Sequence, residues 1–325
     1  MRKECKAIKT AEIAEIQGYH CGVGITTNYA FRGFNGNWYF NSDRKEKLVP
    51  GHDGLLYRAN GQAMEGYGLE VEVECRGIRN NRVLAEVFDK IIFPTFKFGA
   101  DMWKMQSDIS LSGGDTSVEC ITQVMTKSRI RNDYSAWKTM FDEYFPVFRI
   151  SADSMGTGNC GMHVNVSNGV FGKTVEAQAT AIRKLFYIVN KHYDFCCKLF
   201  YRNPYKTGYC SRMDYSSAKT LDLYSAMNDH GACMNLSHFR EGRIEIRLVG
   251  GQKDYYTFRN TMESVFFLCE RVRGISWADC DDIVKIFTGC NNYVMKRLPD
   301  CGLSDEQLEA IRATMKPEDL ELRRH

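Results

Sequence analysis

The chain has 325 residues, which is enough for one large domain or two of ordinary size. Its hydrophobic fraction of 44% and charged fraction of 26% are typical of a soluble globular protein. A formal net charge of only +3 argues against a nucleic acid or a membrane surface as partner. No apolar run approaches the roughly 18 residues that span a bilayer, and the basic N-terminus lacks the apolar core of a signal peptide. We therefore expect a cytoplasmic protein.

The 13 cysteines are odd in number and irregularly spaced. No C-x-x-C pair occurs, so the spacing gives no support to a zinc site. Most cysteines lie in apolar segments, such as Cys269 in FFLCERV. We expect free, buried thiols in a reducing compartment.

Residues 1–60 are rich in glycine, asparagine and aromatic side chains. Asn35 and Gly36, between FRGF and NWYF, predict a β-hairpin. Arg32 lies among aromatic residues and leaves open a surface on which nucleic-acid bases could stack. A small β-rich element is the favoured interpretation of this composition.

The stretch GLEVEVE, residues 68–74, alternates strictly between apolar and acidic side chains. As a strand it would place Glu70, Glu72 and Glu74 on one face. Three like charges in a row repel one another unless a cation lies between them. A divalent cation would remove that repulsion, because it takes carboxylate oxygens as ligands. The alternative is the solvated face of an amphipathic strand.

Helices and strands alternate in the segment that follows. A helix is predicted over 82–92, before Pro94, with an apolar face of Val83, Leu84, Val87, Phe88 and Ile91. Residues 103–119 are typical of a strand, a loop and a strand with a Gly113–Gly114 turn, and Ser117 and Glu119 share one face of the second strand. A second helix is predicted over 133–145, with an apolar stripe of Trp137, Met140 and Phe141.

Two further strands carry polar faces. MHVNV, 162–166, places His163 and Asn165 on one face, and RIEIRLV, 243–249, does the same for Arg243, Glu245 and Arg247. Between them, a long helix is predicted to begin after Thr174 and to run to about Arg202. Another helix follows Asp254, with an inward set of Phe258, Met262, Val265, Phe266 and Cys269. Short helices are expected after about 275, and Ser304 with Gln307 forms a capping box.

If these strands are neighbours in one antiparallel sheet, their polar faces merge into a cleft lined by carboxylates. Such a cleft suits Mg²⁺ or Mn²⁺ bound to a triphosphate, with arginine paired to the transferring phosphoryl group. Each part also has a plainer interpretation. A lone strand histidine is more often structural, and Glu-x-Arg on a strand is most often a solvated face.

Four segments in order resemble the amidoligase family: GLEVEVE, SDISLSGGDTSVE, NCGMHVNVS and RIEIR. That family is similar to glutamine synthetase and glutamate–cysteine ligase, and the resemblance covers roughly residues 66–270. It implies an α+β fold, with a glutamine-synthetase-like curved antiparallel sheet and helices on its outer face. It also implies ATP-dependent amide formation through an acyl phosphate, with ATP and Mg²⁺ or Mn²⁺ as cofactors. Residues 1–60 and the tail lie outside the resemblance, so we expect a β-rich extension over 1–60, a catalytic domain over 61–275 and a helical segment over 276–325.

The resemblance also implies roles for single residues. The metal-binding set is Glu70, Glu72, Glu119, His163 and Glu245. The nucleotide-side set is His163, Asn165, Ser167, Arg202 and Arg247, of which Arg247 would contact the phosphoryl group. The catalytic set is Glu72, Glu119, Arg247 and Asp108, with Asp108 or Glu74 as candidate base.

The sequence departs from the family pattern at two points. Asn165 stands where some members have histidine, and asparagine is the poorer metal ligand. Ile109, after Asp108, replaces a glycine of the second motif. Two other functions stay open: a phosphagen-type kinase on the same fold, and a non-catalytic binding or assembly protein. The expected partners are carboxylate and amine substrates, either small molecules or peptides, and a homo-oligomer is not excluded.

Overall fold

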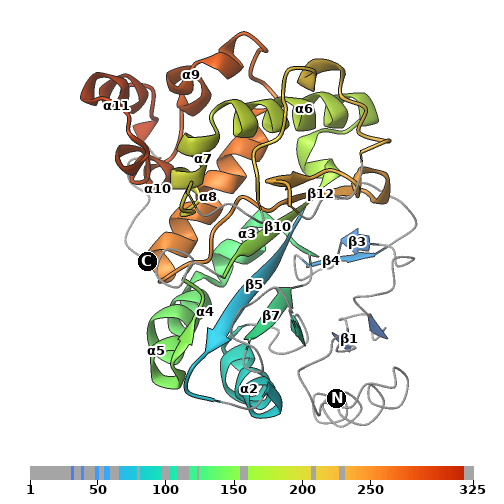
Figure 1. Cartoon of the computed structure of the whole chain (residues 1–325), viewed down its shortest axis with the longest axis vertical. Coiled ribbons are helices and arrows are strands. Elements are labelled where there is room, and N and C mark those ends of the chain that lie inside the picture. Colours follow the sequence, from blue (N-terminus) through green and yellow to red (C-terminus); the bar gives the residue numbers. More distant parts are fainter. Residues whose placement is uncertain are drawn as a thin grey trace. The chain divides into compact units, whose positions relative to one another are not determined.

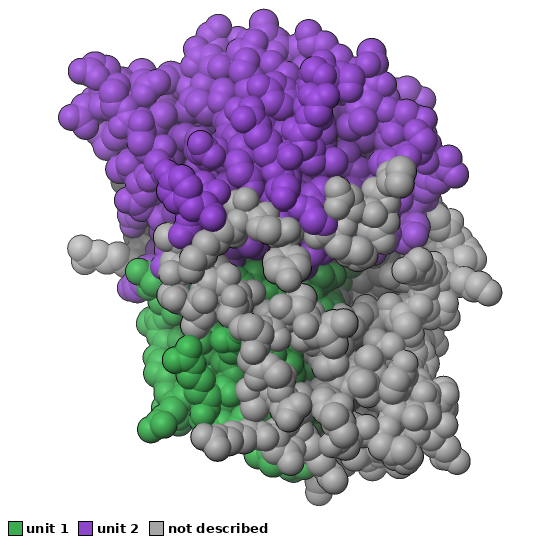
Figure 2. Space-filling view, viewed as in Figure 1, with its two compact units in different colours: residues 1–62, 66–162, 253–255 green, residues 63–65, 163–252, 256–325 purple. Residues whose placement is uncertain are grey.

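The computed structural model describes residues 66–78, 81–96, 103–107, 117–122, 124–153, 160–205, 210–226 and 231–317, and the backbone of four short strands before them. The chain divides into two compact units, which Figure 2 colours separately. The first contains residues 1–62, 66–162 and 253–255, and the second contains 63–65, 163–252 and 256–325. In both units, the described strand pairs within the unit run antiparallel and are accompanied by helices, so this is a mixed α/β protein.

Four short strands lie in the N-terminal part of the first unit. β1 (Phe31–Arg32) pairs with β2 (Trp38–Tyr39), as the predicted hairpin requires, although the Asn35–Gly36 turn lies outside the described residues. β3 (Leu48–Pro50) pairs with β4 (Leu55–Arg58), and β4 pairs in turn with β8 (Val124–Met125). The aromatic side chains proposed for nucleic-acid stacking are outside the described residues.

Strand β5 (Tyr67–Cys75) is the longest strand of the first unit. It pairs over five residues with β7 (Ser117–Thr122), which pairs on its other side with β6 (Trp103–Ser107). β9 (Ile150–Ser151) pairs with the end of β5. The predicted apolar face of β5 is buried, and Glu72 and Glu74 on its other face are buried as well, at 5% and 7% exposed. The solvated-face interpretation of this strand is therefore wrong at Glu72 and Glu74.

The first predicted helix has a different apolar face from the one expected. α2 (Asn81–Val87) continues into the π-helix η1 (Phe88–Ile92) and the 3₁₀ turn η2 (Phe93–Thr95). Leu84 and Phe88 are buried as predicted, but Val83 is 48% and Ile91 is 41% exposed. A π turn takes more residues than an α turn, so it rotates the buried face onto Ile92 instead of Ile91.

A second helical run also contains a π segment. It comprises α3 (Lys127–Asn132), α4 (Tyr134–Lys138), η5 (Thr139–Tyr144) and α5 (Phe145–Phe148). The predicted stripe of Trp137, Met140 and Phe141 is buried. The rings of Trp137 and Phe141 belong to an aromatic cluster in which Trp103 stacks on Phe93, with ring centroids 4.7 Å apart. The cluster comprises Phe88, Phe93, Phe96, Trp103, Trp137, Phe141 and Phe145.

The second unit contains a three-stranded arrangement. β12 (Arg243–Ile246) pairs with β10 (Met162–Ser167) on one side and with β11 (Met234–Asn235) on the other. Figure 1 shows β10 and β12 side by side, below α6 in that view. β12 ends at Ile246, three residues earlier than expected, because the N–H groups of Arg247 and Leu248 both donate to the carbonyl of Cys233.

The long helix predicted after Thr174 is two helices. α6 (Val175–Lys191) and α7 (Tyr193–Leu199) are separated by His192, whose φ of −101° and ψ of 40° interrupt the helix. Thr174 caps α6 as predicted, and its side chain accepts from the Ala177 N–H. In α8 (Tyr255–Arg271) all five residues predicted to face inward are buried.

Short helices make up the C-terminal part, as expected. They are η9 (Asp279–Asp281), α9 (Ile283–Phe287), α10 (Asn292–Met295), η10 (Leu298–Cys301) and α11 (Asp305–Arg312). Ser304 and Gln307 form the predicted capping box at the start of α11. The short 3₁₀ turns η6 (Asn168–Phe171), η7 (Ala218–Thr220) and η8 (Phe239–Glu241) connect earlier elements. Among the described residues, no helix is long and apolar enough to cross a membrane.

Candidate functional site

Two buried carboxylates face each other in the first unit. Glu72 of β5 lies directly opposite Glu119 of β7, and each side chain is 5% exposed. One carboxylate oxygen of Glu72 lies within 4.8 Å of one of Glu119. Two carboxylates this close favour a shared proton or a cation between them. The sequence predicted both residues, and the strand register brings them together.

Gly161 fixes the orientation of Glu72. The backbone N–H of Glu72 donates to the Gly161 carbonyl at 3.1 Å, and the Gly161 N–H donates to Oε2 of the Glu72 side chain. The same residue therefore holds both the backbone and the carboxylate. A hydrogen bond to the ionised form favours the charged carboxylate.

Cys160, which precedes Gly161, lies near the charges of Glu72 and Glu74. Burial raises the pKa of the Cys160 thiol well above its usual value, and the nearby charges of Glu74 and Glu72 raise it further. Cys160 therefore lies close enough to Glu72 and Glu74 for their charges to act on its thiol. Glu70, at the other end of the predicted acidic face, is partly exposed and lies opposite Ile121. Asp108 lies outside the described residues.

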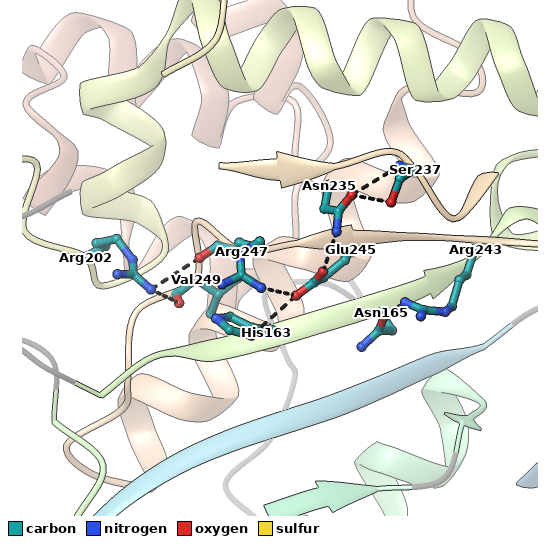
Figure 3. Close-up of polar contacts among 9 residues, drawn as sticks. All are labelled: His163, Asn165, Arg202, Asn235, Ser237, Arg243, Glu245, Arg247 and Val249. Carbon is teal, nitrogen blue, oxygen red and sulfur yellow. Dashed lines mark hydrogen bonds and ion pairs between the residues drawn. The ribbon is translucent and has the colours of Figure 1, made fainter. Parts of the chain in front are cut away.

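A second polar network occupies the second unit. Glu245 of β12 is buried, and its Oε1 accepts from Nη1 of Arg247 at 2.7 Å (Figure 3). The same oxygen lies 3.4 Å from Nδ1 of His163 on β10. Glu245 thus holds the guanidinium of Arg247 and lies close to the imidazole of His163 on the neighbouring strand.

Asn235 belongs to this network, although its sequence context did not single it out. It lies opposite Glu245 across the β11–β12 pair, and its Nδ2 donates to Glu245 Oε2 at 3.2 Å. Its own Oδ1 accepts from the N–H and the hydroxyl of Ser237, at 3.1 and 2.8 Å. An Asn-x-Ser turn was the available sequence signal, because asparagine often accepts from the residue two positions later.

The remaining predicted residues of the second unit lie around these strands. Asn165 shares the face of His163, lies opposite Glu245, and accepts from Nη1 of Arg243. Ser167 is buried at the end of β10, opposite Arg243. Arg202 follows α7 and donates to main-chain carbonyls beyond β12 (Figure 3). The predicted nucleotide contacts of these residues stay predictions.

The site residues thus form two sets, one in each unit. The first is an acidic set: Glu72 and Glu119, whose oxygens lie within 4.8 Å of each other, and Glu70, two residues before Glu72 on β5. Its hard oxygen donors are those that Mg²⁺ and Mn²⁺ prefer. The second combines His163, Glu245 and Arg247, which together offer an imidazole and a guanidinium held by a carboxylate. Comparison with known proteins adds no assignment, since no family model and no curated protein matches the sequence.

Proposed function

We propose that the protein is an ATP-dependent carboxylate–amine ligase. The observation that carries this proposal is the pair of buried carboxylates, Glu72 and Glu119, that face each other across β5 and β7. Two oxygen ligands within 4.8 Å of each other suit a hard divalent ion. Glu70, which precedes Glu72 on the same face of the strand, is the third carboxylate of this set. A divalent ion bound to them would neutralise the charge of a triphosphate.

The second polar set supplies the groups that phosphoryl transfer needs. Arg247 is suited to contact the transferring phosphoryl group, because its guanidinium is oriented by Glu245 before any substrate binds. The imidazole of His163 lies near the same carboxylate, with Nδ1 3.4 Å from Glu245 Oε1. Preorganised donors of this kind stabilise charge that develops on phosphate oxygens without first having to reorient.

The proposed fold is a glutamine-synthetase-like curved antiparallel sheet. Two observations support it: the strand pairs within both units are antiparallel, and four of the strands carry the acidic, histidine and arginine motifs in the family order. The resemblance of these motifs to amidoligases is the remaining support. The three-part division at residues 60 and 275 is part of the same proposal.

The reaction would proceed in two steps. The substrate carboxylate attacks the γ-phosphorus of ATP, the bond from that phosphorus to the bridging oxygen breaks, and ADP leaves. The resulting acyl phosphate is a far better acylating group than a free carboxylate. An amine then attacks the carbonyl carbon, the C–O bond to phosphate breaks, and orthophosphate leaves. The amine must lose a proton before or during attack, so a carboxylate base is required. Asp108 and Glu74 are the candidates.

The decisive experiment measures phosphate release from ATP with Mg²⁺ across a panel of amino acids and dipeptides. Wild type is compared with Glu245→Gln, which keeps the shape of the side chain but removes its charge. The exposed Glu309→Gln on α11, whose partner is Arg312, serves as control. We expect turnover that requires both a carboxylate and an amine and that is lost only in Glu245→Gln.

Two other results of this experiment would indicate a different function. A phosphorylated product without an amide would identify a kinase that stops after phosphoryl transfer. The absence of metal-dependent nucleotide binding in wild type would contradict the ligase proposal and favour a binding or assembly protein.

A further inference from the structure

The segment that carries Arg247 is held in place by its backbone. The N–H groups of Arg247 and Leu248 donate to the Cys233 carbonyl at 2.9 and 3.0 Å. Two residues further along, the Gly250 N–H donates to the Phe200 carbonyl at 3.0 Å. These three bonds involve N–H groups of the segment, and the carbonyls of residues 247–249 need donors of their own.

Arg202 donates to all three of those carbonyls. Its Nε reaches the Leu248 carbonyl at 3.1 Å. Its Nη2 reaches the carbonyls of Arg247 and Val249 at 3.2 and 2.8 Å (Figure 3). The base of the Arg202 side chain is fixed as well, because its own N–H donates to the Cys197 carbonyl at the end of α7 at 2.8 Å. The preceding residue, Tyr201, has a φ of 58° and turns the chain in the left-handed conformation.

We propose that Arg202 is a positioning residue for Arg247. One planar guanidinium fixes three consecutive carbonyls, and this sets the point from which the Arg247 side chain leaves the backbone. From there Arg247 Nη1 meets Glu245 Oε1 at 2.7 Å, and its buried Nε has no hydrogen-bond partner. Because the backbone at Arg247 is fixed, the guanidinium of Arg247 keeps one orientation in the absence of substrate. The role of Arg247 toward phosphate rests on the proposed function, but its orientation by Arg202 does not.

Lysine could not replace this arginine. Its ammonium group is a point charge on a flexible stem, whereas the guanidinium presents donors in a rigid fork. Loss of the fork would leave the carbonyls of residues 247–249 without their present donor and allow the segment to adopt several conformations. The guanidinium of Arg247 would then lose its single orientation, even if the fold persists.

The matched control is Arg271, a second arginine of the same unit with the same kind of bonding. It belongs to α8, and its Nε and Nη2 donate to the carbonyls of Ile286 and Lys285, at 3.1 and 2.6 Å, in α9. Arg271→Met removes carbonyl bonds of the same type without touching residues 247–249. It therefore separates a general loss of stability from a loss of positioning.

The test follows the Nε–H signal of Arg247 by NMR on the full chain without nucleotide. The signal is identified as the one that Arg247→Lys removes. In Arg202→Met we expect hydrogen exchange with water at this Nε–H to speed up by about tenfold or more, because local opening no longer breaks three hydrogen bonds. In Arg271→Met we expect the exchange rate to stay within about twofold of wild type. Should Arg202→Met not fold, Arg202→Lys takes its place, with faster exchange again expected.

An Arg247 signal that exchanges at the wild-type rate in the folded Arg202 variant would overturn the proposal, and so would equal acceleration in Arg271→Met. Where ligase turnover is found, Arg202→Met should lower kcat by about tenfold or more and leave the KM for ATP within about twofold, because a positioned guanidinium acts mainly in the transition state. A rise in the KM for ATP by the same factor as the fall in kcat would count against the positioning role. Because the NMR measurement needs no substrate, the positioning role and the ligase function can fail independently.

Discussion

Asn235 and Glu245 lie opposite each other on β11 and β12, and the asparagine amide donates to the glutamate carboxylate at 3.2 Å. Both residues are buried, at 1% and 5% exposed. Glu245 thus receives a donor on each oxygen, from Asn235 on Oε2 and from Arg247 on Oε1. This carboxylate is therefore held by Asn235 from the neighbouring strand β11 and by Arg247 from its own segment of the chain.

Asn235→Asp should destabilise the protein through this contact. The substitution places a second carboxylate against Glu245 and removes the amide donor, so we expect a loss of about 2–3 kcal/mol in the free energy of unfolding near neutral pH. The loss should shrink as the pH falls, because protonation of one carboxylate removes the repulsion. Ser237→Ala, which removes only one bond to Asn235, should cost about 1 kcal/mol. Urea denaturation measures both, and equal losses would contradict the carboxylate contact.

Divalent ions should stabilise the wild-type chain through the acidic set of the first unit. A ligand that binds only the folded state raises the melting temperature with its concentration. We expect Mn²⁺ to raise the Tm of wild type and to have much less effect on Glu72→Gln and Glu119→Gln. Glu86→Gln is the control, since Glu86 is an exposed residue paired with Lys90 on the surface. A wild-type response to Mn²⁺ in the Glu72 and Glu119 variants would exclude these carboxylates as ligands.

Stability should fall in mildly acidic solution because of two histidines. Burial lowers the pKa of His192 and His238 below the usual 6.5, and the charge of Arg243 lowers that of His238 further. As the pH drops below about 6.5, these histidines therefore take up protons in the unfolded chain before they do so in the folded protein. Their contribution to the free energy of unfolding is fully present above this pH and is lost as the pH falls below it. The double variant His192→Asn/His238→Asn should lose less unfolding free energy than wild type between about pH 7.5 and about pH 5.5. An identical pH slope in both proteins would show that other groups control it.

The described cysteines should resist alkylation while the protein is folded. Burial raises the pKa of Cys280 to about 11, and that of Cys197, Cys233 and Cys301 to about 12. Iodoacetamide reacts with the thiolate, so at about pH 8 we expect native rates about 100-fold or more below those of the urea-unfolded chain. Cys280 should be the fastest of the four. Peptide mass spectrometry distinguishes these residues from Cys5 and Cys21, which lie outside the described residues, and a native Cys280 as reactive as the unfolded one would contradict the prediction.

Local patterns in the sequence were sufficient to predict most of the strands and caps. Alternation located β5, β7, β10 and β12 and assigned their faces, because a strand repeats every two residues whatever its neighbours are. Thr174 and Ser304 were predicted as helix caps for a similarly local reason. The apolar surroundings of most cysteines in the sequence predicted free, buried thiols, and all 11 cysteines among the described residues are free and buried.

Contacts between distant parts of the chain could not be predicted in this way. The bonds of Arg202 join residues 45 to 47 positions apart in sequence, and no local pattern marks their partners. Asn235 acquires its role only through the register of β11 on β12. The break of the long helix at His192 and the early end of β12 have the same origin, since tertiary contacts override a favourable local pattern. The site residues were therefore predicted one by one, and their partners were not.

The two π segments make the first unit sensitive to small changes in chain length. Deleting one residue from η1 or η5 would restore α-helical hydrogen bonding, but would turn the residues that follow by about 100°. Phe93 after η1 and Phe145 after η5 would then leave Phe88, whose ring they flank at 5.3 and 6.2 Å between centroids. Insertions and deletions are therefore excluded from these turns by the geometry of the aromatic cluster, and homologues should vary in length elsewhere.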